Sequence, residues 1–263
     1  MDLGIKGKTA LVIASSQGLG KAVATELAKE GANVMLTSRN EEALQEAKAE
    51  IEEVAIGRVS FYVCDITKPD EIKQLVKETQ EKFGTIQILL NNAGGPLSGN
   101  FDDFGDEDWQ NAFELNLLSY IRVIREVLPD LRKEGGRIAN IASISVKKPI
   151  SNLILSNTFR NGIVGLSKTL AEELAPDNIL VNVIAPGTIE TGRIQKLNED
   201  RAEKQNKSLE QIKEETINNI PLGRMGTPEE FAKAVAFILS DANSYITGTT
   251  LLIDGGMAKV ISS

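Results

Sequence analysis

The sequence has no histidine and only one cysteine, Cys64. Without histidine, the chain cannot build a serine–histidine–aspartate triad or a cysteine–histidine dyad, and it lacks the commonest zinc ligand. We therefore expect no metal site. Acid–base chemistry must use tyrosine, lysine, carboxylates, or hydroxyls that act together with water. A single cysteine cannot form an internal disulfide, which is typical of a protein of the reducing cytoplasm.

Long apolar runs and an excess of positive charge are also missing. No apolar run approaches the roughly eighteen residues that a membrane span requires, so no membrane association is expected. The first residues lack the basic segment and cleavage site of a secretory signal, which again favours a cytoplasmic location. The net charge is −8, and no basic stripe with interleaved aromatic residues occurs, so nucleic acid is not an expected partner.

Seven short segments rich in apolar and β-branched residues alternate with helical patterns along the 263 residues. The strand candidates are residues 9–14, 33–38, 58–64, 86–91, 136–142, 179–185 and 249–254. Several of them are apolar without alternation, as in strands that are covered on both faces. This β–α order predicts one doubly wound α/β domain over residues 1–263, with a parallel seven-stranded sheet.

Two of the helical segments begin with recognisable caps. Asn40 precedes two glutamates, and Thr227 precedes a proline and two glutamates; both patterns are typical of helix N-termini. A longer helix is predicted for residues 155–174. Its apolar face is predicted to consist of Leu155, Phe159, Ile163, Leu166, Leu170 and Leu174.

Residues 192–219 form a long charged insertion between the sixth strand and the last long helix. The segment can be a solvated surface helix. It can also be a mobile lid, because loops that follow the carboxyl ends of strands form the active rim of open α/β sheets. The two interpretations are compatible, and we favour a substrate lid whose outer face is charged.

A glycine-containing turn lies between the first strand and the following helix. Glycines let such a turn approach a pyrophosphate, which then lies at the positive N-terminus of the helix. The serine hydroxyls can add donors to phosphate oxygens. The predicted cofactor-binding residues of the turn are Ser15, Ser16, Gln17, Gly18, Leu19 and Gly20.

The turn is one of several motifs by which the chain resembles the short-chain dehydrogenase/reductase family, close to the 3-oxoacyl-(acyl-carrier-protein) reductases. The family writes the turn as Thr-Gly-x-x-x-Gly-x-Gly. Here Ile13 and Ala14 replace the first two residues, whereas Gly18 and Gly20 match. The other matching motifs are Asn91-Asn92-Ala93-Gly94 after the fourth strand, Pro186 to Thr191 after the sixth, and Asp254-Gly255-Gly256 after the seventh.

The resemblance implies a Rossmann-type fold, a nicotinamide cofactor and a set of cofactor contacts. It assigns the adenine to Asp65 and Ile66, and the nicotinamide half to Asn92, Ala93, Gly94, Arg160, Pro186, Gly187, Ile189 and Thr191. The second strand ends in Arg39, with no acid before Glu41. An arginine at this place suits a 2′-phosphate, whereas an acid suits a free ribose 2′-hydroxyl, so we expect NADP(H) rather than NAD(H).

The family's catalytic group is Asn, Ser, Tyr and Lys, and the resemblance places the first two at Asn116 and Ser143. The Tyr position is thirteen residues after that serine, and the Lys position four residues later. They correspond to Ser156 and Arg160, so both key side chains are exchanged. A serine hydroxyl is far less acidic than a phenol, and an arginine stays protonated.

Three explanations of this exchange stay open. Ser143, Ser156 and a water polarised by Arg160 can form a weaker proton relay; Tyr120 can supply a phenol; or the protein binds a nucleotide with weak or no catalysis, in a regulatory or scaffolding role. The resemblance implies a small carbonyl or acyl-thioester substrate, or the corresponding alcohol. It also implies a homo-oligomer, often a tetramer in the family.

Overall fold

The computed structural model describes residues 1–261 and contains one parallel sheet of seven strands in the order β3-β2-β1-β4-β5-β6-β7. The strands are β1 (Thr9–Ile13), β2 (Asn33–Ser38), β3 (Val59–Val63), β4 (Ile86–Asn91), β5 (Gly136–Ile141), β6 (Ile179–Pro186) and β7 (Thr250–Ile253). All seven predicted strands are confirmed, and no end differs from the prediction by more than one residue. The predicted doubly wound α/β fold is therefore confirmed.

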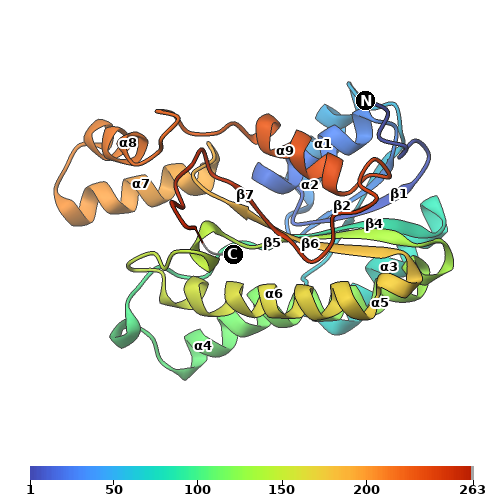
Figure 1. Cartoon of the computed structure of the whole chain (residues 1–263), viewed down its shortest axis with the longest axis horizontal. Helices are drawn as coiled ribbons and strands as arrows, with labels where there is room; N and C mark the ends of the chain where they lie inside the picture. The colour runs from blue at the N-terminus through green and yellow to red at the C-terminus, as the bar shows by residue number, and fades with distance from the viewer. Residues whose placement is uncertain (262–263) are drawn as a thin grey trace.

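Helices cover both faces of the sheet (Figure 1). One face carries α1 (Gly18–Lys29), α2 (Glu41–Glu52) and α9 (Pro228–Ile238), and the other carries α3 (Pro69–Phe83), α5 (Ser119–Glu134) and α6 (Ile154–Glu173), with α4 (Asp106–Phe113) beside α6. Short helical turns span Phe101–Asp103, Ile144–Val146 and Ala175–Asp177, and a π-helical segment spans Glu114–Leu118. Every residue of β1 and β5 is buried, as expected for strands covered on both faces.

Both predicted helix caps are formed. The side chain of Asn40 accepts a hydrogen bond from the backbone N–H of Ala43 at 3.1 Å, at the start of α2. The hydroxyl of Thr227 accepts from the N–H of Glu230 at 3.2 Å, and the Glu230 carboxylate accepts from the N–H of Thr227 at 2.9 Å. This reciprocal capping box satisfies two backbone donors at the start of α9.

The chain reverses its direction of strand addition between β1 and β4. From β1 the sheet first grows outward through β2 and β3, and then grows the other way through β4 to β7. Such a switch point leaves a crevice at the carboxyl ends of the two strands, where open α/β sheets bind ligands. The loops that follow β1, β4, β5 and β6 all begin at this edge of the sheet.

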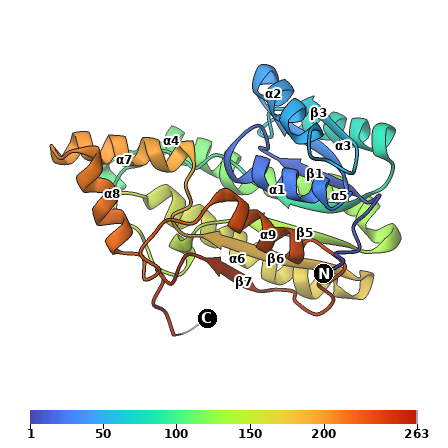
Figure 2. The same cartoon turned by 90° about the horizontal axis from the view of Figure 1, so that it is seen from above.

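The charged segment 192–219 forms two helices, α7 (Gly192–Gln205) and α8 (Leu209–Asn218). They follow β6 and project beyond the body of the sheet, packed against each other (Figures 1 and 2). Arg201 of α7 and Glu215 of α8 form an ion pair at 2.7 Å between the two helices. None of the helices in residues 1–261 is both long and apolar enough to cross a membrane.

Candidate active site

The turn after β1 is held by its own backbone and by one buried hydroxyl. The hydroxyl of Ser15 donates to the carbonyl of Val12 at 2.8 Å and accepts from the N–H of Thr37 in β2 at 2.9 Å. This hydroxyl therefore braces the turn, contrary to the expected hydroxyl donor to phosphate, and the Ser15 backbone N–H is engaged too, donating to the Thr37 carbonyl at 3.0 Å. Ser16 is half-buried and Gln17 is exposed, so their side chains remain accessible.

Two positions of this turn have special backbone requirements. Ala14 has a φ of +52°, a left-handed conformation that disfavours any residue with a Cβ atom. The family's glycine at this place would adopt it without strain. A Cβ atom on Gly20 would lie 2.2 Å from the Ala14 carbonyl oxygen, so only glycine fits where α1 begins. The Asn92 amide also donates to the Ala14 carbonyl, at 3.3 Å, and joins the turn to the loop after β4.

Arg39 and Asp65 follow the carboxyl ends of the neighbouring strands β2 and β3. Arg39 is exposed, and Asp65 accepts hydrogen bonds from the backbone N–H and the hydroxyl of Thr67 at 2.9 and 2.8 Å. Burial acts to raise the pKa of Asp65, but the Thr67 bonds and the charges of Arg39 and Lys68 lower it below its usual value. A positive side chain and a charged carboxylate thus lie together where the resemblance places the adenosine half of the cofactor.

A chain of buried polar side chains connects β4, β5 and α6. The Asn91 amide donates to the Asn140 side chain at 2.9 Å, and the Asn140 amide donates to the Ser167 hydroxyl at 2.9 Å. The Ser167 hydroxyl then donates to the Ile163 carbonyl within α6 at 2.7 Å. These bonds fix α6 against the centre of the sheet, because a buried polar group without a partner is costly.

Asn116 and Ser143 come from the π-helical segment before α5 and from the loop after β5. Asn116 belongs to the π-helical segment and is fully buried, and its amide donates to the Gly94 carbonyl at 2.7 Å. Its Oδ1 atom has no partner within residues 1–261, which leaves it able to accept a hydrogen bond from a water. The Ser143 oxygen accepts from the N–H of Ser145 at 3.1 Å, so the hydroxyl proton of Ser143 remains available.

The buried face of α6 differs from the predicted one. The prediction placed Phe159, Leu166 and Leu170 on the apolar face, but these three residues are only half-buried. The buried residues of α6 are Leu155, Ser156, Arg160, Ile163, Ser167 and Ala171. The helix therefore turns a stripe containing polar side chains toward the sheet, because the Asn140 and Arg160 contacts need that orientation.

Arg160 is 4% exposed, and its guanidinium has three partners: the phenol of Tyr120 on α5 and two carbonyls at the carboxyl ends of β4 and β5. Nη1 donates to the Tyr120 hydroxyl at 2.9 Å and to the Ile141 carbonyl at 2.8 Å, and Nη2 donates to the Ala93 carbonyl at 3.3 Å. Ser156, one turn earlier on the same face, is 7% exposed. Arg160 therefore lies between the loops that contain Ala93 and Ser143.

Tyr120 is a core residue. It is 1% exposed, and its hydroxyl donates to the Ile141 carbonyl at 2.8 Å. Burial raises the pKa of Tyr120, and the charge and hydrogen bond of Arg160 oppose this effect only in part. The phenol is thus protonated at neutral pH and its proton is engaged, which argues against the direct proton donor considered from the sequence.

The loop after β6 approaches the turn after β1 and the end of β7. A Cβ atom on Gly18 would lie 3.8 Å from the Thr191 side chain, and one on Gly187 would lie 2.7 Å from the Asp254 side chain. Ile189 is 4% exposed and packs on Gly226, so its side chain points into the protein. The predicted nicotinamide loop is therefore brought beside the predicted phosphate turn.

The sequence reasoning missed Arg193 and Gly95. Arg193 is in the first turn of α7, and its Nη1 donates to the Gly95 carbonyl at 3.3 Å. A Cβ atom on Gly95 would lie 1.9 Å from Arg193 Nη2, so the guanidinium lies directly over this glycine. The only sequence signal was a basic residue at the start of the predicted lid.

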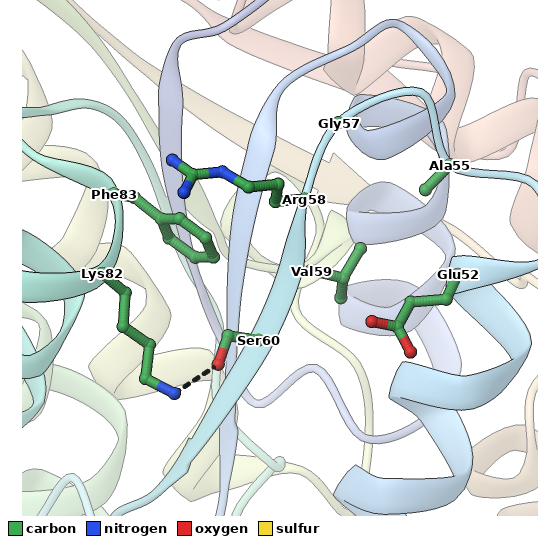
Figure 3. Close-up of a pocket in the computed structure, with 8 residues that line it drawn as sticks. All are labelled: Glu52, Ala55, Gly57, Arg58, Val59, Ser60, Lys82 and Phe83. Carbon is green, nitrogen blue, oxygen red and sulfur yellow. Dashed lines mark hydrogen bonds between the residues drawn. The ribbon is translucent and has the colours of Figure 1, made fainter.

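Other features of the described residues offer no competing site for this chemistry. A hollow lies beside the first residues of β3 and is lined by Glu52, Ala55, Gly57, Arg58, Val59, Ser60, Lys82 and Phe83 (Figure 3). It is at the opposite end of the strand from Asp65, and Lys82 donates to the Ser60 hydroxyl at 2.9 Å within it. Burial raises the pKa of the Cys64 thiol to about 12, so this thiol is a poor nucleophile. Residues 1–261 contain no cluster of acidic or cysteine side chains that could hold a metal ion.

Comparison with known proteins agrees with this geometry. The profile of a family described as enoyl-(acyl carrier protein) reductase matches residues 13–258. Dehydrogenase/reductase SDR family member 4 of Caenorhabditis elegans is 39% identical over 254 residues, which are 96% of this chain and 95% of that protein. The chain belongs to the short-chain dehydrogenase/reductase family.

Other members of the short-chain dehydrogenase/reductase family are similar along their full length. The 3-oxoacyl-(acyl-carrier-protein) reductase of Chlamydia trachomatis is 36% identical over 252 residues, covering 95% of this chain and 97% of the relative. L-sorbose reductase from Gluconobacter frateurii, crystallised with NADPH and L-sorbose, superposes with a TM-score of 0.94 at 33% identity. The match covers 99% of this chain and 100% of that reductase.

Proposed function

We propose that this protein is an NADP(H)-dependent oxidoreductase that reduces a carbonyl compound of the 3-oxoacyl-thioester kind, or oxidises the corresponding alcohol, with an atypical active site. Residues 1–263 form one catalytic domain in this proposal, and residues 192–219 form a substrate lid. The observation that carries it is the convergence of the loops after β1, β4 and β6: Asn92 bonds to Ala14, and Thr191 lies against Gly18. The sugar and thioester reductases above provide the analogy for the reaction.

The cofactor is assigned as NADP(H) on the charge at the end of β2. Arg39 is exposed there and acts on the pKa of Asp65, so its positive charge lies at the adenosine end of the crevice. An arginine at this place suits the 2′-phosphate. The glycine turn and the N-terminus of α1 suit the pyrophosphate, and Ala93, Gly94 and Arg160 suit the nicotinamide ribose.

When bound, the cofactor supplies or accepts a hydride, and the protein must hold the substrate oxygen and move one proton. The Ser143 hydroxyl can donate to the substrate oxygen, since its own oxygen already accepts from Ser145. Asn116 can hold a water through its unpartnered Oδ1 atom. Arg160 adds a fixed positive charge between them, which stabilises negative charge that develops on the substrate oxygen.

The exchanged Tyr and Lys positions make this an unusual reductase. In our proposal, Ser156 and Arg160 occupy these positions, and the proton passes through Ser143, Ser156 and water. Arginine cannot deliver a proton at neutral pH, so Arg160 acts only by charge and hydrogen bonding. Losing a positioned general acid typically costs about 10²- to 10⁴-fold in rate, and we expect turnover to be slower by this order than in relatives with the complete group.

A second candidate function is nucleotide binding with weak or no catalysis. The observation that favours it is the engagement of Tyr120, which leaves no free phenol at the end of β5. A panel of carbonyl compounds with NADPH discriminates the two functions. Nucleotide binding without any NADPH oxidation across the panel would support the second function and contradict the first.

The cofactor assignment is tested by fluorescence titration with NADPH and NADH. The native protein should prefer NADPH, and Arg39→Asp should weaken NADPH binding while sparing NADH. Lys29→Gln, which removes one exposed positive charge at the end of α1, is the matched control and should change neither affinity. Equal affinity of the native protein for the two nucleotides would contradict the assignment.

The proton route is tested by substitutions on α6. Ser156→Ala should reduce NADPH oxidation with 3-oxo thioesters, and Ser156→Tyr combined with Arg160→Lys should raise it toward the rates of relatives with the complete group. Native turnover that is unchanged by Ser156→Ala would show that the proton comes from elsewhere. Tyr120→Phe would then be the next variant to assay.

We also propose a homo-oligomer, with an aromatic patch at α4 and α6 as the contact. Trp109 lies between Phe101 and Phe159, with ring centroids 6.3 and 5.9 Å apart, and Phe113 is 6.1 Å from Phe159. Phe101 is 68% exposed, which is unusual for a large apolar side chain in such a cluster. Light scattering should give a multiple of the chain mass, reduced by Phe101→Asp; the mass of one chain in the native protein would rule this out.

A further inference from the structure

Two guanidinium groups from different helices reach the same short stretch of backbone. Arg160 of α6 donates to the Ala93 carbonyl, and Arg193 of α7 donates to the Gly95 carbonyl, each at 3.3 Å. The Gly94 carbonyl between them accepts from Asn116 at 2.7 Å. Three consecutive carbonyl oxygens of the loop after β4 thus accept hydrogen bonds from two arginines and one asparagine. This places two positive side chains beside the proposed reaction centre.

The two arginines repel each other and have no acidic partner within residues 1–261. Desolvation, and after it the charge of Arg160, lower the pKa of Arg193, although the residue as a whole is exposed at the start of α7. The chain has 37 acidic and only 29 basic residues, so carboxylates are plentiful. Within residues 1–261, however, the arginines that form ion pairs are Arg122, Arg132, Arg137, Arg201 and Arg224. Two neighbouring cations without a counter-charge are stabilised when an anion binds between them.

Both guanidiniums retain free hydrogen-bond donors. A guanidinium has five N–H groups. The bonds of Arg160 use both N–H groups of Nη1 and one of Nη2, which leaves its Nε–H and one Nη2–H without a partner in the described chain. Arg193 uses only one donor, toward Gly95. Planar, paired N–H donors match the two oxygens of a carboxylate.

We propose that Arg160 and Arg193 together bind a carboxylate of the substrate, so that the carbonyl compound is an oxo acid and its reduced form a hydroxy acid. This inference rests on the proposed reductase function and replaces the thioester of its substrate class with a free carboxylate. Arg160 also contacts the Ile141 carbonyl, two residues before Ser143, so the carboxylate lies next to the carbonyl that Ser143 holds. Arg193 lies in the first turn of the proposed lid. The lid therefore contacts the substrate carboxylate directly when it closes.

The rival anion is the cofactor pyrophosphate, because Arg193 is two residues from Thr191, which lies against Gly18. The glycine turn and the first N–H groups of α1 already suit that group. Arg160 is committed to the Ile141 and Ala93 carbonyls at the ends of β5 and β4. A pyrophosphate on Arg193 alone would leave the charge of Arg160 uncompensated.

The first experiment measures binding and does not depend on turnover. Malonate is titrated by calorimetry into the full-length protein saturated with NADPH, with malonamide as the neutral isostere and inorganic phosphate as a second anion. Malonate should bind, and malonamide should bind at least roughly tenfold more weakly. Added salt should lower the affinity for malonate. Equal affinity for malonate and malonamide, or tighter binding of phosphate than of malonate, would overturn the proposal.

Variants assign the binding to the two arginines. Arg193→Gln should lower the affinity for malonate roughly tenfold or more and leave the NADPH affinity unchanged. Arg193→Lys should restore part of the malonate affinity. Lys196→Gln, an exposed charge on the same helix, is the control and should have no effect. Gly95→Ala should act like Arg193→Gln, because its new methyl group displaces the guanidinium while the charge is kept.

Two further outcomes separate this inference from the proposed function. If Arg193→Gln weakens the binding of NADPH and leaves the binding of malonate unchanged, the anion between the arginines is the pyrophosphate and the proposal is wrong. If the native protein binds no NADPH, the reductase function fails, and malonate titration of the free protein still decides whether the arginine pair binds a carboxylate. In turnover assays, 3-oxobutanoate should show a lower KM than its methyl ester or thioester, and a lower KM for either neutral compound would contradict the assignment.

Discussion

The guanidinium of Arg160 and the phenol of Tyr120 form one buried unit: Nη1 donates to the phenol oxygen at 2.9 Å, and both groups donate to the Ile141 carbonyl. The arginine is thereby fixed at the end of β5, although it comes from a helix. A lysine at this position would have a single ammonium group in place of the planar fork. The position proposed for the exchanged catalytic lysine and the core tyrosine are thus structurally linked.

Tyr120→Phe should destabilise the protein by about 1–3 kcal/mol, because it removes an acceptor from a buried charged donor. Urea unfolding measures the loss. The substitution should raise KM for oxo acids more than it slows turnover, since Tyr120 positions Arg160 and gives no proton to substrate. If turnover instead slowed by roughly 100-fold or more while KM stayed unchanged, Tyr120 would be identified as the proton source.

Ala14→Gly should stabilise the protein by roughly 1 kcal/mol. The left-handed φ of +52° strains alanine, and this cost outweighs the extra freedom that glycine gives the unfolded chain. Thermal unfolding with and without NADPH measures the effect, and NADPH affinity should not fall. Ala175→Gly, in the short helical turn after α6, should instead destabilise the protein, because Ala175 has no such strain.

Asp130→Asn should destabilise the protein at neutral pH and much less at acidic pH. Burial acts to raise the pKa of Asp130, but its hydrogen bonds from Lys133, Ile86 and Gln80 lower it overall. A depressed carboxyl pKa gives stability that is complete above about pH 4 and is lost as pH falls through the folded-state value. Melting temperatures of both proteins at pH 7 and pH 3 should therefore converge on acidification.

Residues 192–219 should exchange amide hydrogens faster than the sheet, and they should become protected when NADPH and a carboxylate ligand bind together. The reason is that α7 touches the body of the site through Arg193, whose contact with Gly95 is a single long hydrogen bond. Mass-spectrometric exchange measures the change. Equal protection with and without ligands would contradict a lid.

The sequence allowed all seven strands to be predicted nearly to the residue, because strands buried on both faces are continuous apolar runs bounded by turn residues. Asn40 and Thr227 identified their helices because capping is a local interaction. The buried face of α6 was predicted in part: Leu155, Ile163 and Leu174 are buried, but Phe159, Leu166 and Leu170 are only half-buried. Ser156, Arg160 and Ser167 face the sheet because of distant partners such as Asn140 and Tyr120, which periodicity does not report. Arg193 was missed for the same reason, since its contact with Gly95 joins residues 98 positions apart.

The side chains proposed to bind the substrate, hold the water or pass the proton are two hydroxyls, one amide and two guanidiniums, and groups of these kinds do not ordinarily change charge between about pH 5 and 9. The phenol beneath them is held protonated by its burial. A reductase that relies on a titrating tyrosine or histidine loses or gains activity as that group ionises. This site should instead give a nearly level rate profile across the same range. Because the chain has no histidine, the activity of the enzyme should then depend little on pH.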